Sequence, residues 1–375
     1  MSLKDIITKD VLESNRKRNE NMRSVAVYLN TLPNDSKVAR EKIAIMTAFA
    51  EPLSRDPDID LTLVKSMSSP QQRELFRRGE RFKVYDTDFS FSFGYHFSPN
   101  PTTLRSCLRK ELTAKHKKDG KIWYTDANPL GCYEKAIHNN KACSRVRIAY
   151  GDIYPDKAQY FNKNSPGDRW EQLAKEWKIK VKSYKDILPE RHANCEKGFI
   201  YICCNRGSSG YSAFGRNAAD WAIETANKIR KYTNRPIIIR QHHASRYPTY
   251  NRDKQVLDEY AAKRRMKYKD IITIESPTGT YPNLIERTKQ AHAVVVFTST
   301  AGASAIIEGV PLFVEHESSF LYAMSAGEYK NIEDPNFNLN RNQFLHDYAY
   351  AHWSTEELKK GLYWKRVRDQ ILSSS

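Results

Sequence analysis

Short apolar runs alternate with longer segments of helical periodicity along most of the chain, which predicts an α/β fold. In the second half, residues 199–204 and 236–240 are nearly continuous runs of Ile, Phe, Tyr and Cys, each followed by a polar loop and a helical pattern. Such runs are typical of buried parallel strands. Further strands are expected at 271–274, 294–297 and 312–314, and helices at 252–266, 281–290 and 301–308.

The first half has the same alternation. Strands are expected at 25–29, 61–64, 83–85 and 121–125, and helices at 41–53 and 103–118. Residues 131–197 read as irregular, apart from a helix near 169–177. Strands separated by helices predict parallel sheets covered on both faces. We therefore expect two Rossmann-like domains facing a cleft, over residues 1–190 and 191–345, with C-terminal helices in 346–375 packing back toward the first domain.

An aromatic segment lies between the third and fourth expected strands. Residues 89–97 read Phe-Ser-Phe-Ser-Phe-Gly-Tyr-His-Phe, which we interpret as a loop whose Tyr95 and His96 contact an acceptor. Phe89, Phe91 and Phe93 also alternate as a strand would. Core packing of these three rings therefore remains an open alternative.

A polar turn follows the strand expected at 294–297. Thr298, Ser299 and Thr300 are followed by Ala301, Gly302 and Ala303, where a helix begins. Small side chains and a helix N-terminus favour an anion. The alternative is an ordinary strand–helix–strand unit without a ligand.

The loops after the strands of the second half should meet at one edge of the sheet. The residues of these loops that we expect to bind a donor are Arg206, Gly207, Ser208, Ser209, Arg240, His242, His243, Thr278, Ser299, Thr300, Ala301 and Gly302. Arginines, histidines and glycine-freed backbone suit a diphosphate. Adjacent histidines point apart, so no metal site is expected. The Gly-rich loop at 206–215 matches neither a Walker A loop nor a dinucleotide fingerprint, which argues against kinases, ATPases and dinucleotide dehydrogenases.

Asp126 is the candidate catalytic base. It directly follows the strand at 121–125, where a carboxylate can deprotonate a hydroxyl nucleophile. Asp-Ala-Asn-Pro is also a good turn sequence, so a structural role stays open. Asp152 and Asp168 are rivals, and Asp168 is better interpreted as a helix cap.

The charge balance points to a polyanionic partner. The chain has 61 Lys and Arg against 44 Asp and Glu, a formal net charge of +17. Nucleic acid is the first expectation and an anionic membrane surface the second, against a basic soluble enzyme with neither. The helix at 103–118 is strongly basic, and its Arg105, Arg109 and Lys110 are candidate acceptor contacts or a solvated face. Without a secretory segment or a membrane-spanning run, and with six cysteines interpreted as reduced, a cytoplasmic monomer is expected.

Two motifs of the second half resemble a known family. Arg240-Gln-His-His and Thr298-Ser-Thr-Ala-Gly-Ala-Ser-Ala-Ile-Ile-Glu-Gly-Val-Pro311 are similar to the nucleotide-sugar half of GT-B glycosyltransferases, especially the capsule-polysaccharide, Kdo-transferase-like group. This chain has His243 where that group has proline, and Ser304 where it has glutamate. Ser304 and Glu308, one turn later, are therefore added to the expected donor site.

A tighter resemblance covers residues 121–370. Asp126-Ala-Asn-Pro, Tyr150-Gly-Asp-Ile, Gly167-Asp-Arg-Trp, Ile202-Cys-Cys-Asn-Arg, Tyr232-Thr-Asn-Arg-Pro and the tail 344–364 resemble bacteriophage glycosyltransferases that act on hydroxymethylated DNA bases. The resemblance implies a GT-B fold, a catalytic role for Asp126 and a UDP-sugar such as UDP-glucose as co-substrate. It also implies no tightly bound cofactor, no required divalent metal, and 5-hydroxymethylcytosine or a similar base in double-stranded phage DNA as acceptor.

Two other functions stay open. The first is a glycosyltransferase acting on a polysaccharide or a lipid-linked acceptor, with the same donor motifs. The second is a non-catalytic nucleic-acid-binding protein with this fold. For a viral protein the expected compartment is the host cytoplasm.

Overall fold

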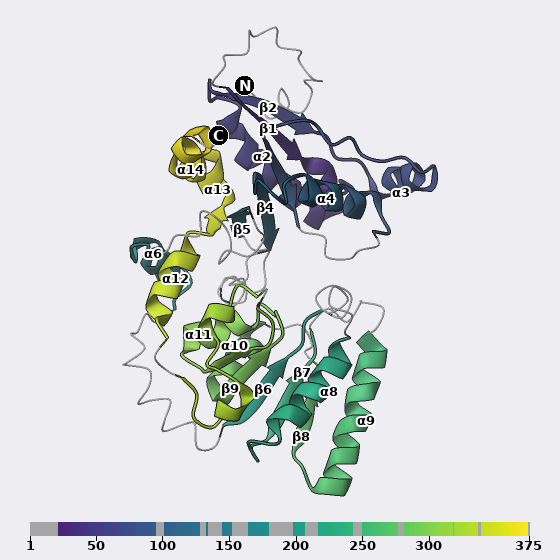
Figure 1. Cartoon of the computed structure of the whole chain (residues 1–375), viewed down its shortest axis with the longest axis vertical. Coiled ribbons are helices and arrows are strands. Elements are labelled where there is room, and N and C mark those ends of the chain that lie inside the picture. The colour runs from purple at the N-terminus through teal and green to yellow at the C-terminus, as the bar shows by residue number, and fades with distance from the viewer. Residues whose placement is uncertain are drawn as a thin grey trace. The chain divides into compact units, whose positions relative to one another are not determined.

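The computed structural model of the chain describes residues 22–94, 101–127, 133, 145–151, 164–179, 198–206, 217–242, 250–276, 281–317, 319–336 and 339–373. Contacts divide the chain into two units, and Figure 1 labels most of their helices and strands. The first comprises Met1–Ala127, Ser144–Tyr160 and Ala351–Ser375, and the second comprises Asn128–Cys143 and Phe161–Tyr350. Each unit contains one sheet with helices packed on it. The expected fold class, α/β with two Rossmann-like units, is confirmed.

The first unit contains a six-stranded sheet in the order β11-β5-β4-β3-β1-β2. Its strands are β1 (Arg23–Tyr28), β2 (Ile59–Val64), β3 (Phe89–Phe93), β4 (Ile122–Ala127), β5 (Arg145–Tyr150) and β11 (His352–Ser354). Strands β1 to β4 are mutually parallel, but β5 runs antiparallel to β4, and β11 antiparallel to β5. The expectation of a purely parallel sheet is wrong here. All six residues of β5 are buried, and a strand buried on both faces reads the same in either direction.

Helices cover both faces of this sheet. They are α2 (Lys37–Leu53), α3 (Ser69–Arg77), α4 (Leu104–Lys115), α13 (Thr355–Lys359) and α14 (Leu362–Ser373), with the short turn η1 (Leu29–Thr31). Helix α2 places Phe49 in stacked contact with Phe91 of β3, with ring centroids 4.1 Å apart. On the opposite face, Leu108 and Leu112 of α4 pack on Ala26 and Ile122. A capping box between Thr103 and Ser106 fixes the start of α4.

The aromatic segment of the first unit corrects two expectations. Residues 83–85 form no strand, and Phe89–Phe93 is not a loop but the fully buried strand β3. The packing alternative therefore holds for these three phenylalanines. The intervening serines are buried as well, and Ser90 is hydrogen-bonded to His116. The bond to His116 satisfies the Ser90 hydroxyl inside the fold, whereas the buried Ser92 hydroxyl has no hydrogen-bond partner among the described residues.

The second unit contains a five-stranded sheet in the order β10-β9-β6-β7-β8, and every pairing in it is parallel, as expected. Its strands are β6 (Phe199–Cys203), β7 (Ile237–Arg240), β8 (Ile272–Glu275), β9 (Ala291–Val296) and β10 (Leu312–Val314). Its helices are α6 (Asp168–Glu176), α8 (Ala218–Ile229), α9 (Tyr250–Tyr268), α10 (Tyr281–Gln290), α11 (Gly302–Glu308) and α12 (Arg341–Ala349), with the turns η3 (Tyr322–Met324) and η4 (Tyr329–Asn331). Isoleucines of β6, β7 and β8 form one core with α8 and α9.

Asp168 does not cap α6. Gly167 occupies the N-cap position without a side-chain bond, and Asp168 is the first helical residue, where a carboxylate favours the helix dipole. Its Oδ1 accepts a hydrogen bond from the Tyr350 hydroxyl at 2.8 Å. No helix in the part of the chain that the structure describes is long and apolar enough to cross a bilayer.

Candidate functional site

Polar side chains gather at the carboxyl ends of the strands in the second sheet. The Nδ2 of Asn205, after β6, donates to the Oγ1 of Thr298, after β9, at 2.7 Å. The Oγ of Ser276, after β8, donates to the Oε1 of Gln241, after β7, at 2.9 Å. These bonds join the loops of neighbouring strands into one polar edge. Asn205 and Gln241 are not among the expected donor residues, although their position directly after a strand is the signal that could have identified them.

Arg240, the last residue of β7, is held inside the unit. Its guanidinium forms an ion pair with Glu275 of β8 and donates to the Tyr201 hydroxyl at 3.0 Å. Arg287 of α10 lies 3.4 Å from the other carboxylate oxygen of Glu275. Burial acts to lower the pKa of Arg240, but Tyr201, Cys203 and Glu275 outweigh it and the pKa is raised. Arg240 is thus a permanently charged and largely satisfied member of an Arg–Glu–Arg triad.

The backbone N–H groups at the start of α11 are less available to an anion than the sequence suggests. The backbone N–H groups of residues 302, 303 and 304 donate to the carbonyl oxygens of residues 299, 300 and 301 at 3.1, 3.1 and 3.2 Å. A Cβ added to Gly302 would lie 2.8 Å from Leu321 and 3.0 Å from Leu312. Ser304 is fully buried and bonded to Thr288. Packing against core side chains therefore accounts for Gly302 and Ser304 without a ligand.

The remaining donor candidates fall into three groups. Arg206 and Thr300 are exposed, while His242 and Ala301 are half-buried and Ser299 is buried. Glu308, at the C-terminal end of α11, accepts a 2.7 Å hydrogen bond from the Tyr133 hydroxyl. Eight candidates for the donor, acceptor or catalytic sites lie outside the described residues: Tyr95, His96, Asp152, Gly207, Ser208, Ser209, His243 and Thr278.

Asp126 lies at the carboxyl end of β4 in the first sheet. It is inside the strand, as its second-to-last residue, and the antiparallel register places it opposite Arg147 of β5. The Asp126 Oδ2 lies 3.8 Å from Arg147, whose side chain is 6% exposed, while that of Asp126 is 40% exposed. The carboxylate is therefore accessible and held beside a buried arginine. Arg147 is not among the expected site residues, because residues 145–150 are not expected to form a strand.

A cluster of cations occupies the same edge of the first sheet, and we name it the Lys42 cluster (Lys42, Arg105 and Arg109). The Nζ of Lys42 lies 4.4 Å from the ring centre of Phe93, the last residue of β3. Burial lowers the pKa of Arg109 to about 10; Arg105 adds to the shift and Asp126 opposes it. Burial also lowers the pKa of Lys42; Asp126 opposes this and Arg109 adds to it. Lys110, by contrast, is exposed on the same helix as Arg109.

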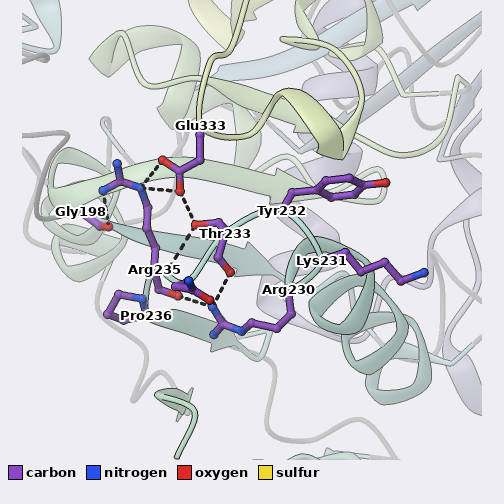
Figure 2. Close-up of a pocket in the computed structure, with 9 residues that line it drawn as sticks. Gly198, Arg230, Lys231, Tyr232, Thr233, Arg235, Pro236 and Glu333 are labelled. Carbon is purple, nitrogen blue, oxygen red and sulfur yellow. Dashed lines mark hydrogen bonds and ion pairs between the residues drawn. The ribbon is translucent and has the colours of Figure 1, made fainter. Parts of the chain in front are cut away.

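A pocket of about 810 Å³ opens at the other end of the second sheet, before β6 and β7 (Figure 2). Its two arginines are held by acidic side chains, while Lys231 also lines the pocket. Arg235 bonds both oxygens of Glu333, and Arg230 donates to two backbone carbonyls of the loop and to Asp270. These bonds fix the turn that leads into β7. We interpret the pocket as a structural hollow, because the carboxyl edge is where open parallel sheets bind ligands.

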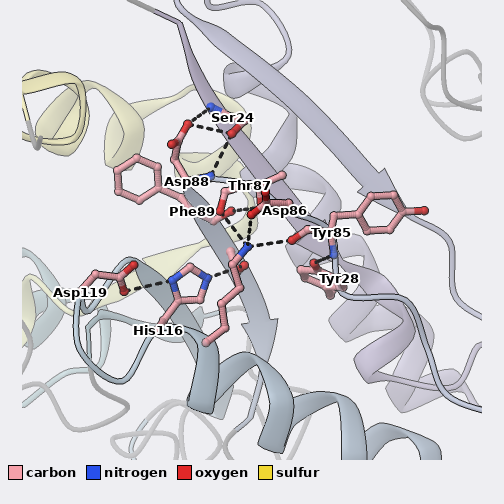
Figure 3. Close-up of polar contacts among 11 residues, drawn as sticks. Ser24, Tyr28, Tyr85, Asp86, Thr87, Asp88, Phe89, His116 and Asp119 are labelled. Carbon is pink, nitrogen blue, oxygen red and sulfur yellow. Dashed lines mark hydrogen bonds and ion pairs between the residues drawn. The ribbon is translucent and has the colours of Figure 1, made fainter.

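Ser90, His116 and Asp119 form a Ser–His–Asp arrangement in the first unit, of which Figure 3 labels His116 and Asp119. The Ser90 Oγ lies 2.9 Å from the Nε2 of His116, whose Nδ1 lies 3.2 Å from Asp119. Ser90 is fully buried on β3 and His116 is 2% exposed, so no substrate reaches the hydroxyl. Nearby, Lys115 donates to the carbonyl oxygens of Tyr85 and Thr87. The arrangement is a structural network that joins the end of α4 to the sheet.

Within the described ranges, no group of three His, Cys, Asp and Glu side chains is placed to hold a metal ion. No family model and no curated protein matches the sequence. Among solved structures, a β-Kdo 2,7-transferase, KpsC of Thermosulfurimonas dismutans, matches with 13% identity and a TM-score of 0.46, over 92% of this chain and 99% of that one. A UDP-forming α,α-trehalose-phosphate synthase of Burkholderia xenovorans matches with 12% identity and a TM-score of 0.37, over 90% and 79%.

A third match is the UDP-GlcNAc 2-epimerase of Neisseria meningitidis, solved with UDP-GlcNAc bound. It has 10% identity and a TM-score of 0.36, over 92% of this chain and 100% of that one. All three likenesses are distant. The case for a function therefore rests on the residues of this chain.

Proposed function

We propose that this protein is a glycosyltransferase that moves a sugar from a nucleotide-sugar donor to an acceptor hydroxyl. The observation that carries the proposal is Asp126, an accessible carboxylate at the carboxyl end of a parallel strand, where α/β sheets bind ligands. Glycosyl transfer to a hydroxyl requires removal of a proton as the new bond forms, and a positioned carboxylate supplies this.

In the proposed reaction, the acceptor hydroxyl gives its proton to Asp126 as its oxygen attacks the anomeric carbon of the sugar. The bond from that carbon to the nucleoside diphosphate breaks, and the diphosphate leaves with the electron pair. Arg147 lies 3.8 Å from the Asp126 carboxylate and helps to hold it in position for the attack. This single displacement inverts the anomeric centre.

The donor is proposed to bind at the carboxyl edge of the second sheet. Arg206, His242, Ser299 and Thr300 are the described residues whose position there suits contacts with a diphosphate. Arg240 contributes its charge from inside the unit, where Glu275 holds it. We propose a UDP-sugar such as UDP-glucose, with arginines in place of a divalent metal at the leaving group.

The proposed acceptor is 5-hydroxymethylcytosine, or a similar hydroxymethylated base, in double-stranded DNA. The supports are the sequence resemblance over residues 121–370 and the net charge of +17, which favours a polyanion. A base inside a duplex would have to leave the stack to reach a carboxylate. A polysaccharide or lipid-linked acceptor would use the same donor chemistry.

The test incubates the protein with hydroxymethylcytosine DNA and a panel of nucleotide sugars, digests the DNA to nucleosides and weighs them. A nucleoside heavier by one sugar, formed by the wild type and lost in Asp126→Asn, is the expected result. Release of UDP without a change in DNA mass would contradict DNA as the acceptor and favour a saccharide. If no nucleotide sugar is bound or consumed with either acceptor, the chain is not a glycosyltransferase. A parallel reaction in EDTA tests the metal-independent mechanism, and an unchanged rate is expected.

A further inference from the structure

The Lys42 cluster combines three cations with little negative charge. Neither Lys42 nor Arg109 forms an ion pair with any acidic side chain in the described part of the chain. Asp126 is close enough to influence the pKa of both, but its carboxylate lies beside Arg147. Burying cations without partners is unfavourable, so an arrangement of this kind implies a ligand that completes it.

We propose that the Lys42 cluster is a binding site for a phosphate group carried by the acceptor. The proposal rests on the proposed function and adds the chemical class of the acceptor. Lys42, which the sequence did not single out, is its central residue. The phosphate would bind beside Asp126, so the acceptor is one whose reactive hydroxyl and phosphate belong to the same molecule.

Arg109 is built into the edge of the sheet rather than extended into solvent. Its Nη2 donates to the carbonyl oxygen of Thr31 at 2.7 Å. Its guanidinium packs against Gly94, where an added Cβ would lie 3.4 Å from the Cζ of Arg109. The Nε of Arg109 is buried and has no hydrogen-bond partner among the described residues. The guanidinium is therefore fixed in place with donor capacity left over.

Lys42 approaches the edge from α2. Its ammonium lies over the ring of Phe93, the last residue of β3, and Arg109 is near enough to lower its pKa. A cation on an aromatic face keeps its N–H donors available on the side away from the ring. Arg105, one turn before Arg109 on α4, is held partly by attraction to Asp35. An ammonium and a fixed guanidinium together suit a tetrahedral anion that carries one or two charges.

The partial burial of the cluster favours one enclosed phosphate over a row of backbone phosphates. Backbone tracking along a nucleic acid uses exposed cations. Lys110 is exposed, whereas Arg109 is half-buried and its Nε is fully enclosed. Two sources supply such a phosphate. It is either the phosphate of a flipped nucleotide in DNA or the phosphate of a sugar phosphate.

The test measures binding of inorganic phosphate to the full chain by calorimetry and by the shift in Tm, with excess UDP present to fill a donor site. Lys42→Met keeps the length of the side chain and removes its charge. Lys37→Met is the matched control, because Lys37 is an exposed lysine of the same helix. We expect Lys42→Met to weaken phosphate binding about tenfold or more and Lys37→Met to change it less than about twofold.

Without phosphate, Lys42→Met should raise Tm, because it removes a half-buried charge that Arg109 repels. Equal phosphate binding by Lys42→Met and the wild type would overturn the proposal, whether or not the protein transfers a sugar. Two competitors then separate the sources: a hydroxymethylcytosine oligonucleotide and a hexose 6-phosphate. Displacement of phosphate by either, in the wild type and not in Lys42→Met, supports the site and identifies its source; displacement by neither overturns it.

Discussion

The carboxyl edges of the two sheets differ in how their buried arginines are paired. In the second sheet, Glu275 and the Tyr201 hydroxyl hold Arg240, and Arg287 is near the same carboxylate. In the first sheet, and within the part of the chain that the structure describes, Arg109 donates to a backbone carbonyl and Lys42 lies over an aromatic ring, and neither forms an ion pair. The buried charge of Arg240 is thus neutralised by a glutamate of the same unit. The charges of Lys42 and Arg109 have no such counter-ion among the described residues and are available to a bound anion.

This difference indicates which of these cations are structural and which are expected to contact a ligand directly. The desolvation penalty for an unpaired buried ion is several kcal/mol, and a well-placed counter-ion offsets much of it. Arg240 has that counter-ion in Glu275. Its charge therefore stabilises the folded unit, and it would act on a bound donor mainly through the electrostatic potential at the carboxyl edge of the sheet. Among the described residues, Lys42 and Arg109 form no ion pair, so an incoming anion would remove a penalty already present in the free protein. A direct contact is therefore a stronger expectation for Lys42 than for Arg240.

Asp126 should give the largest effect, because it is the only group at either edge to which we assign a bond-making step. Asp126→Asn keeps the shape and removes the basicity, so transfer should fall by about 10²–10⁴ with donor binding nearly unchanged. Single-turnover kinetics with saturating donor measure this. Asp168→Asn is the control, since that carboxylate, on α6, accepts a hydrogen bond from Tyr350 and its loss should not affect the rate. A dead Asp152→Asn beside an active Asp126→Asn would make Asp152 the base.

Arg240 and Arg235 lie at opposite ends of β7, each paired with one glutamate. Arg240→Ala should weaken donor binding by about 1.5–3 kcal/mol, because a largely buried charge at the donor edge is lost. Arg235→Ala loses a comparable ion pair, with Glu333, at the far end of the strand. It should destabilise the fold and leave the donor constant unchanged. Calorimetry with UDP, with denaturant unfolding as the second measurement, compares the two variants; equal donor constants would remove Arg240 from the site.

Much of the fold follows from local pattern. All five strands of the second unit lie where the apolar runs place them, because each run is short and bounded by Gly, Pro or polar residues. The first unit was harder to predict. Residues 83–85 have strand composition but form no strand, and β5 went unnoticed in a segment that read as irregular. Pairing and strand direction depend on distant partners, which a single-sequence pattern does not contain.

The candidate site shows the same limit. Position after a strand was enough to select Asp126 and Arg240 from the sequence. It did not reveal that Asp126 faces Arg147 across an antiparallel pair, or that Arg240 would be held by Glu275. Lys42 was missed because it lies in mid-helix, where a lysine ordinarily faces solvent. Gly302 and Ser304 resemble ligand-binding residues in sequence, but their contacts lie in the core.

The turn into α11 permits a test of whether it binds a ligand or only packs. Gly302→Ala places a methyl group 2.8 Å from Leu321 and should destabilise the protein by about 1–3 kcal/mol through overpacking. Thr300→Ala removes an exposed hydroxyl two residues earlier and should leave stability nearly unchanged while weakening the donor. Denaturant midpoints and UDP affinities give both readings. If Gly302→Ala unfolds like the wild type, the glycine is there for a ligand after all.

His116 should give the smallest effect, and it should be one on stability. It lies with Ser90 near the start of β3, away from the edge that carries Asp126. Burial lowers its pKa below the ordinary value near 6.5, against the attraction of Asp119. As the pH falls through about 6.5, the unfolded chain therefore takes up a proton that the folded chain refuses, and stability is lost until the folded pKa is reached. Each unit of pKa difference is worth about 1.4 kcal/mol. Between pH 8 and pH 5, the free energy of unfolding of the wild type should fall with pH more steeply than that of His116→Gln. The pH profile of transfer, corrected for the fraction of folded protein, should be the same for both. A transfer profile that follows His116 would place the histidine in the reaction and abolish the distinction between the two ends of this sheet.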